Sequence, residues 1–136
     1  GSGVAGQGAC TNSSFADQYE LGVHYAPIAD FDLLMAAVES ARELGVKMPV
    51  GNLNSSDTFY DDAGRNARMQ KMGVKDEEIA AAALNCAAAY LGKRALAICS
   101  ISDNLVLGTE LTADERQTTF TNMMKIGLEA AVKMTK

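Results

Sequence analysis

The sequence feature that most constrains the fold is a short, almost continuous apolar run near residue 95. The run reads Ala-Leu-Ala-Ile-Cys over residues 95–99 and lies in the middle of the segment 94–101. It has the length of a strand, and a strand that is apolar on both faces is typical of the interior of a sheet that helices cover on both sides. The run therefore predicts a central strand over 94–101.

Helices are predicted on both sides of this strand from apolar spacing and capping residues. The clearest covers 31–44, with Asp30 as its N-cap and Gly45 beyond its last turn. Residues 112–115, which read Thr-Ala-Asp-Glu, form a capping box and predict a long last helix that ends near Lys133. Two further helices are predicted, a short one between Asp61 and Gly73 and a continuous one over 76–91.

Two more strands complete the predicted pattern. Residues 4–11 are small and glycine-rich, and 46–53 alternate between apolar and polar before a polar turn at 54–57. The intervening segment 12–29 has no periodicity and is predicted as a loop. Strands that alternate with helices favour right-handed crossovers, so we expect a three-layer α/β/α fold with a mostly parallel sheet.

Composition narrows the classes of partner. The net charge of −5 argues against nucleic acid and anionic membranes, which both attract basic surfaces. No apolar run approaches the ~20 residues that span a bilayer, and residues 1–3 are interpreted as a linker or tag remnant without signal-peptide character, ahead of a single domain over 4–136. The three cysteines and one histidine lack the spacing of a zinc site, and free thiols are consistent with a cytoplasmic protein.

Ligands of open α/β sheets bind beyond the carboxyl ends of strands, where this sequence has two polar segments. One is 54–57, and the other is 102–104, which directly follows the apolar run. Asp103 in the second segment could have a raised pKa and act as a general acid. The commoner role for an aspartate at such a place is to cap a turn, and this alternative stays open.

Three other side chains are candidates for a ligand site. Phe59 and Tyr60 could form a stacking wall for a flat ligand, although an aromatic pair at a helix entrance is more often a core contact. Arg116 lies in the first turn of the last predicted helix, where a cation opposes the helix dipole. A carboxylate or ligand partner for Arg116 would explain that position, but an exposed surface arginine is the commoner case.

Several motifs, taken together and in order, resemble purine nucleoside phosphorylase of the hexameric bacterial type. The resemblance covers 4–135, and the last two motifs are specific to that family. The motifs are Gln-Gly-Ala-Cys-Thr-Asn at 7–12, Tyr-Ala-Pro-Ile-Ala-Asp-Phe-Asp at 25–32, Val-Gly-Asn-Leu-Asn-Ser-Ser-Asp-Thr-Phe-Tyr at 50–60, Ile-Ser-Asp-Asn at 101–104 and Thr-Ala-Asp-Glu-Arg-Gln-Thr-Thr-Phe at 112–120.

The resemblance implies phosphorolysis of purine nucleosides, with phosphate as co-substrate, no metal and a hexameric assembly. It implies that Asp103 protonates the leaving purine, that Arg116 orients Asp103, and that Phe59 and Tyr60 line the base pocket. Such roles suit a transition state that needs a neutralised leaving base. The resemblance also implies substrate contacts from Ser102, Glu78 and Ile79.

Two departures from the family pattern weaken the expectation of activity. In the family, the phosphate-binding residues belong to an N-terminal half that the motifs over 4–135 do not match. A neighbouring subunit of the family's assembly supplies further residues of the site. Where the family reads Val-Glu-Met-Glu, residues 77–80 read Glu-Glu-Ile-Ala, so Ala80 stands at the ribose-binding glutamate. Lys75 and Asp76 bring charge into the same segment, which predicts a helix start and looks like a redesigned or naturally altered polar face.

Two main hypotheses follow from these observations. The first is a phosphorylase portion that works only with a complementing half, or weakly alone. The second is an excised or engineered α/β scaffold without catalysis that retains some purine affinity or none. A nucleosidase that uses water is disfavoured, because nucleosidases also need the ribose-binding glutamate.

Overall fold

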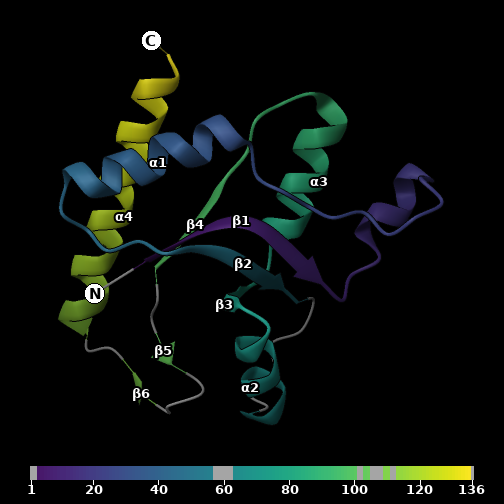
Figure 1. Cartoon of the computed structure of the whole chain (residues 1–136), viewed down its shortest axis with the longest axis horizontal. Coiled ribbons are helices and arrows are strands. Elements are labelled where there is room, and N and C mark those ends of the chain that lie inside the picture. Colours follow the sequence, from purple (N-terminus) through teal and green to yellow (C-terminus); the bar gives the residue numbers. More distant parts are fainter. Residues whose placement is uncertain (1–2, 57–62, 101–102, 105–108, 111–112, 136) are drawn as a thin grey trace.

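The computed structural model describes residues 3–56, 63–100, 103–104, 109–110 and 113–135. Helices α1 and α4 lie on one side of a sheet and α3 lies on the other, which confirms the three-layer α/β arrangement (Figure 1). In chain order the elements are β1 (Gly3–Thr11), the 3₁₀ helix η1 (Phe15–Tyr19), α1 (Phe31–Glu43), β2 (Val50–Ser55), α2 (Ala63–Lys71), β3 (Val74–Glu78), α3 (Ala81–Leu91), β4 (Ala97–Ser100), β5 (Asp103–Asn104), β6 (Thr109–Glu110) and α4 (Ala113–Met134).

The main sheet has four strands in the order β3-β2-β1-β4, and β5 and β6 form a separate two-stranded sheet. β2 pairs in parallel with both β1 and β3, so most of the sheet is parallel, as predicted. The register of β1 on β2 shifts between Gly6 and Gly8. A Cβ at Gly6 would lie 2.5 Å from Cδ1 of Leu53, so glycine makes room there for a fully buried core side chain.

The apolar run near residue 95 forms β4, but the predicted central position is wrong. β4 is an edge strand of the described sheet and runs antiparallel to β1, with Ser100 opposite Gly3. Its residues are only partly buried. Both of its faces still contact apolar side chains, because Ile98 packs against the α1–α4 cluster and Cys99 packs against the α3 cluster. The apolar side chains on both faces of β4 therefore indicate a helix layer on each face of the sheet. They do not indicate a neighbouring strand on each side of β4.

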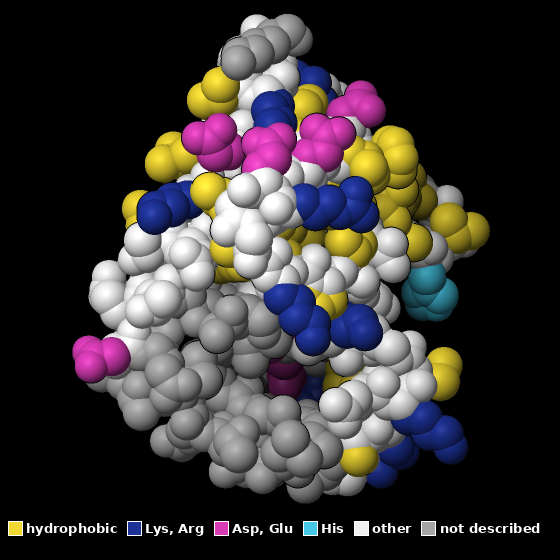
Figure 2. Space-filling model, turned by 60° about the vertical axis from the view of Figure 1, so that its left-hand side comes forward, with side chains coloured by type: hydrophobic (Ala, Val, Ile, Leu, Met, Phe, Trp, Pro, Cys, Tyr) yellow, Lys and Arg dark blue, Asp and Glu magenta, His cyan; other side chains and the backbone are white. Residues whose placement is uncertain are grey.

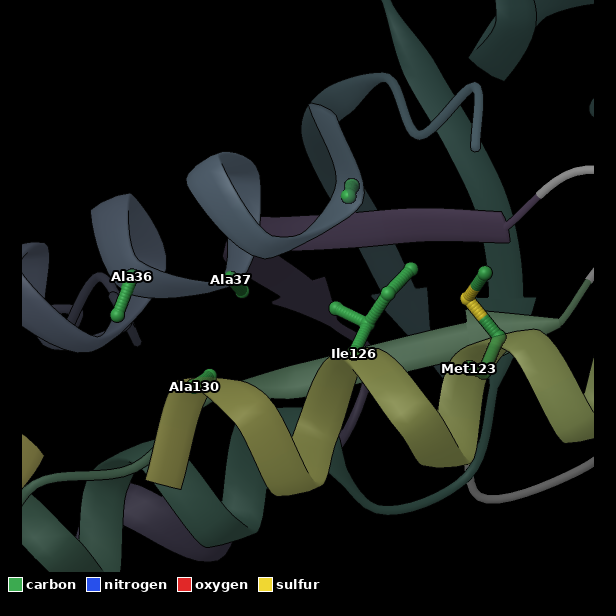
Figure 3. Close-up of a cluster of buried hydrophobic side chains, with 6 residues drawn as sticks. Ala36, Ala37, Met123, Ile126 and Ala130 are labelled. Carbon is green, nitrogen blue, oxygen red and sulfur yellow. The ribbon is translucent and has the colours of Figure 1, made fainter. Parts of the chain in front are cut away.

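Helices α1 and α4 pack together around a cluster of apolar side chains, and α1 also buries Ser40, whose hydroxyl donates to the Ala36 carbonyl at 2.8 Å. Figure 3 shows Met123, Ile126 and Ala130 on the side of α4 that faces α1, close to Ala36 and Ala37. Ile126 is fully buried, and the alanines of α1 let the two helices approach closely. The N-cap prediction for α1 is confirmed, because the Asp30 carboxylate accepts a hydrogen bond of 2.9 Å from the Leu33 backbone N–H.

The opposite face of the sheet carries a second, smaller cluster under α3. Its buried members are Val4 and Ala9 from β1, Leu53 from β2, and Ala81 and Ala82 from α3. Small residues at the start of α3, Ala81 and Ala82, let the helix lie close to the sheet. The predicted loop over 12–29 contains one short 3₁₀ helix, η1.

The predicted continuous helix over 76–91 is wrong. Residues Val74–Glu78 form β3, which pairs in parallel with β2, and α3 begins only at Ala81. The charges at 75–78 favour a helix start when the segment is considered alone. In the folded chain the outer edge of β2 offers a ladder of backbone hydrogen bonds, and polar side chains from β2 and α2 donate to Glu77 and Glu78. Tertiary pairing therefore overrides the local preference.

Candidate functional site

Three parallel strands bring their carboxyl ends together at one edge of the sheet. Thr11 at the end of β1 lies opposite Ser55 at the end of β2, which lies opposite Glu78 at the end of β3. The Thr11 hydroxyl donates a 2.6 Å hydrogen bond to the Ser55 carbonyl and fixes the first two ends together. In open α/β sheets this edge is where ligands bind, so it is the candidate site.

The second polar segment of the sequence leaves the sheet elsewhere. β4 runs antiparallel, so its last residue, Ser100, lies beside the start of β1 and away from the carboxyl ends of β1–β3. Asp103 then pairs with Glu110 in the small β5–β6 sheet. The structure describes only the backbone of Asp103 and of Arg116, which lies in the first turn of α4. Phe59, Tyr60 and Ser102 lie outside the described residues, so all five roles stay predictions.

Glu78 is held by the start of α3. Its carboxylate accepts hydrogen bonds from the backbone N–H groups of Ala80 and of Ala81, the latter at 2.7 Å, and from the Ser55 hydroxyl. Ala80, the N-cap residue, has no side-chain acceptor, so Glu78 supplies the cap from two residues upstream. This observed role is structural, and the predicted contact of Glu78 with substrate stays a prediction.

A cavity of about 550 Å³ opens on the α3 side of this edge. Its walls come from the end of β1, the loop that contains η1, and the first turns of α3. Ile79 borders the cavity and is 71% exposed. Tyr19 of η1 stacks on Tyr90 of α3 with ring centroids 4.6 Å apart, which ties the loop to the helix. Other lining side chains include Thr11, His24, Tyr25, Ser55 and Cys86.

A group of polar side chains lies on the other face of the same edge, and we call it the Glu77 cluster. It consists of Asn54 and Ser56 at the end of β2, Arg65 on α2, and Glu77 on β3. One Glu77 oxygen, Oε1, lies 2.9 Å from the Ser56 hydroxyl, 3.2 Å from Asn54 Nδ2 and 3.2 Å from Arg65 Nη2. Neighbouring residues in a strand face opposite sides, which is why Glu77 and Glu78 serve different groups.

Burial raises the pKa of several groups near this edge. Desolvation raises the pKa of Asp76, and the nearby carboxylates of Glu78 and Glu77 raise it further. The pKa of Cys99 is raised to about 12 by burial, with added repulsion from Asp76 and Glu78, so this thiol stays protonated at neutral pH. Burial also raises the pKa of Cys10, whose thiol donates to the Leu53 carbonyl at 3.3 Å.

The chemistry of this edge suits binding of a small, partly polar ligand. Within the described part of the chain, no group of three or more His, Cys, Asp or Glu side chains could hold a metal ion, and no helix could span a membrane. On the face in Figure 2, Lys and Arg side chains lie among acidic and apolar ones instead of forming one basic patch.

Sequence reasoning found part of the Glu77 cluster. The polar turn at 54–57 was a candidate, but Arg65 and the carboxylate of Glu77 were not. The signal was the alternation of Asn54 and Ser56, which places both side chains on one face of β2, opposite an acid at the same level of β3. Because 76–91 was predicted as a helix, the pairing of β3 with β2 was not predicted.

Comparison with known proteins places the whole chain in one family. The phosphorylase superfamily profile matches residues 4–135. The DeoD-type purine nucleoside phosphorylase of Listeria welshimeri is 43% identical over 130 residues, which cover 96% of this chain and 56% of the relative. The proteins of the same name from Oceanobacillus iheyensis and Tolumonas auensis are 41% and 43% identical, over 96% and 95% of this chain and 56% and 55% of theirs. The chain thus spans about half the length of these curated relatives.

Proposed function

Because this chain belongs to the phosphorylase superfamily, we propose that it binds a purine base or purine nucleoside and does not complete phosphorolysis by itself. The observation that carries the proposal is the identity of 43% with a purine nucleoside phosphorylase over nearly the whole chain. The reaction of the complete parent enzyme would convert a purine nucleoside and phosphate to the free base and a sugar 1-phosphate.

The proposed ligand position is the edge formed by the carboxyl ends of β2 and β3. The sugar would lie beside Ile79, at the mouth of the cavity, and the base near the end of β2. Phe59 and Tyr60, the predicted base-pocket residues, lie outside the described residues. The cavity volume of about 550 Å³ supports this position, because pockets for ligands of this size measure about 300–1,000 Å³.

Two features support binding without turnover. Ala80 stands where the resemblance puts the ribose-binding glutamate, and a methyl group cannot accept hydrogen bonds from sugar hydroxyls. The proposed general acid, Asp103, follows a strand that ends away from the carboxyl ends of β1–β3. Since a catalytic acid must reach its acceptor atom, the chain would need other polypeptide segments to assemble the reacting geometry.

A stable α/β scaffold without any ligand is the second candidate. The two apolar clusters, one on each face of the sheet, favour it, because they give the domain a core that does not depend on substrate. Ligand binding distinguishes the two candidates directly.

The test combines calorimetric binding with an assay for free base. Inosine, adenosine and their 2′-deoxy forms are titrated into the protein, and base release is followed with and without phosphate at high protein concentration. We expect binding without release. Phosphate-dependent release that disappears in Asp103→Asn would show a complete site and contradict the proposal. If no nucleoside binds, the result supports the second candidate, a stable α/β scaffold without a ligand.

A further inference from the structure

Helix α4 carries a second apolar face besides the one that packs on α1. Met123, Ile126 and Ala130 lie on the side toward α1 and are buried (Figure 3). The second face consists of four large side chains spaced four residues apart, and we call it the α4 ridge. Its members are Phe120, Met124, Leu128 and Val132, which are 55%, 51%, 65% and 47% exposed. Four-residue spacing places side chains in one row along a helix, so the ridge runs for about three turns.

The α4 ridge is turned away from the core of the chain. Each residue of a helix advances by about 100°, so the middle of the ridge lies roughly 150° around α4 from the middle of the buried face. A surface helix needs one apolar stripe to pack, and its opposite side is normally polar. A row of exposed apolar side chains on that opposite side is typical of a contact with another molecule.

Gly127 lies beside the ridge, and no packing within the described residues requires a glycine there. A Cβ at Gly127 would meet no atom of these residues within 4 Å beyond the backbone of its own helix. Its φ is also not among the positive values that other glycines of the chain adopt at turns. Glycine in a helix interior lowers stability relative to alanine. What glycine offers at this place is the close approach of a second backbone to α4.

Two opposite charges flank the ridge on one side. Lys125 and Glu129 are both exposed and four residues apart, so they form a row beside the ridge. When two copies of a helix pair in antiparallel fashion about a two-fold axis, the same flank of each copy meets the other. With the axis near residue 126, Lys125 lies within about one helical turn of Glu129 of the second copy. A parallel pair would put these flanks on opposite sides and separate the charges.

The same axis also matches the apolar side chains. Met124 lies opposite Leu128 of the second copy, and Phe120 lies opposite Val132 of the second copy. Gly127 of each copy lies within two residues of the axis, where the two backbones come closest. Apolar ridge, small residue and charges are therefore all compatible with one antiparallel arrangement.

We propose that the α4 ridge is the interface of a homodimer, in which α4 of a second copy of this chain packs antiparallel against it. The contact is isologous and closes on itself, so it gives a dimer and not a filament. The ridges supply affinity, and the two Lys125–Glu129 pairs set the orientation. A single pair of short helix faces is a small interface, so the dimer dissociates on dilution. The interface is independent of nucleoside binding, because α4 and the cavity lie on opposite faces of the sheet.

Sedimentation equilibrium of the whole chain, from about 10 μM to about 1 mM, measures the association. We expect a monomer that becomes a dimer within this range. Met124→Glu places a charge against an apolar side chain and should raise the Kd of the dimer about 10-fold or more. Met72→Glu makes the same substitution at a position outside α4 that is 83% exposed, and this matched control should leave the Kd unchanged.

Two further changes test the geometry of the dimer. Gly127→Leu meets open space in the monomer but fills the gap between the helices, so the Kd should rise about 10-fold while resistance to urea stays the same or increases. Lys125→Glu opposes like charges across the pair and should weaken the dimer, most strongly at low salt. The double variant Lys125→Glu/Glu129→Lys should restore it. Urea unfolding in dilute solution, where the chain is monomeric, shows that each variant folds.

The outcomes decide between a second copy and other occupants of the ridge. A chain that stays monomeric at 1 mM overturns the proposal, and so does a dimer that neither Met124→Glu nor Gly127→Leu weakens. A monomeric chain whose ridge binds the part of the Listeria welshimeri relative that it does not match would assign the face to that polypeptide instead. Weakening by both variants, with Met72→Glu unchanged and the double charge variant restored, supports the antiparallel homodimer.

Discussion

The α1–α4 face and the carboxyl edge of β2–β3 are stabilised in opposite ways. On the first, alanine, methionine and isoleucine side chains make up the buried cluster, and the buried Ser40 hydroxyl bonds to the Ala36 carbonyl within α1. On the second, acidic residues at 76–78 are held by hydroxyl, amide, guanidinium and backbone donors. The first face gains stability from burial, which depends little on chemical detail. The second depends on the donors that reach its carboxylates, and such an arrangement can recognise a ligand.

The largest expected effect comes from a substitution in the apolar cluster between α1 and α4. Ile126→Ala removes a fully buried side chain and should lower the free energy of unfolding by about 2–5 kcal/mol. Urea unfolding followed by circular dichroism measures the change. Leu128→Ala, on the same helix but 65% exposed, is the matched control and should change stability by less than about 0.5 kcal/mol. Equal effects of the two substitutions would show that α4 does not use this face for packing.

The next effect tests whether Glu78 caps α3. Glu78→Ala removes the acceptor of two backbone N–H groups and of the Ser55 hydroxyl, and should cost about 1–3 kcal/mol. Glu39→Ala, which removes an exposed carboxylate from α1, serves as the control and should cost far less. Amide hydrogen exchange should quicken at the first turn of α3. Unchanged exchange there would contradict the capping role.

The smallest effect concerns pH and Asp76. Burial raises the pKa of Asp76, so the folded state binds this proton more tightly than the unfolded chain does. The charged form therefore costs stability at pH 7, and that cost disappears as pH falls through the raised pKa toward the ordinary value of about 3.9. Asp76→Asn keeps the acceptor for the Glu77 N–H and removes the charge, so it should stabilise the protein at pH 7.

Urea unfolding of the parent protein and of Asp76→Asn at several pH values checks the sign of this effect on stability. The difference in unfolding free energy between Asp76→Asn and the parent should be largest at pH 7, should shrink as pH falls through the raised pKa, and should vanish only below the ordinary value of about 3.9. A difference that grows as pH falls would mean that Asp76 is stabilised as a carboxylate.

Much of the fold could be predicted from sequence, because local signals and tertiary structure agree there. The Asp30 cap, the length of α1 and the layering of helices on both faces all follow from periodicity and capping. The errors at β3 and β4 share a cause. Strand neighbours are chosen by distant segments, so the charges at 75–78 and the apolarity of 95–99 could not show which edge each strand would occupy.

The candidate site was less predictable than the fold. The carboxyl ends of strands were the right place to search, and the polar segment that begins at Asn54 does reach that edge, although Asn54 and Ser55 are the last residues of β2 and not a turn. The sequence does not show the direction of β4, so 102–104 was expected beyond the same edge of the sheet as 54–57, whereas β4 runs antiparallel to β1. The Glu77 cluster joins residues from β2, α2 and β3, and no spacing within one segment could have brought Arg65 to it.

The position of β1 between β2 and β4 also sets the order in which the two sides of β1 can pair during synthesis. One side of β1 can pair once residues 50–55 exist, but the other pairs with 97–100, which are made much later. At typical rates of about 5–20 residues per second, the chain from Ser55 to Ser100 takes about 2–9 s to make. Throughout that interval the first strand has one unpaired side, so a ribosome-bound chain that stalls before residue 97 is expected to engage chaperones, and release from them should coincide with the emergence of β4.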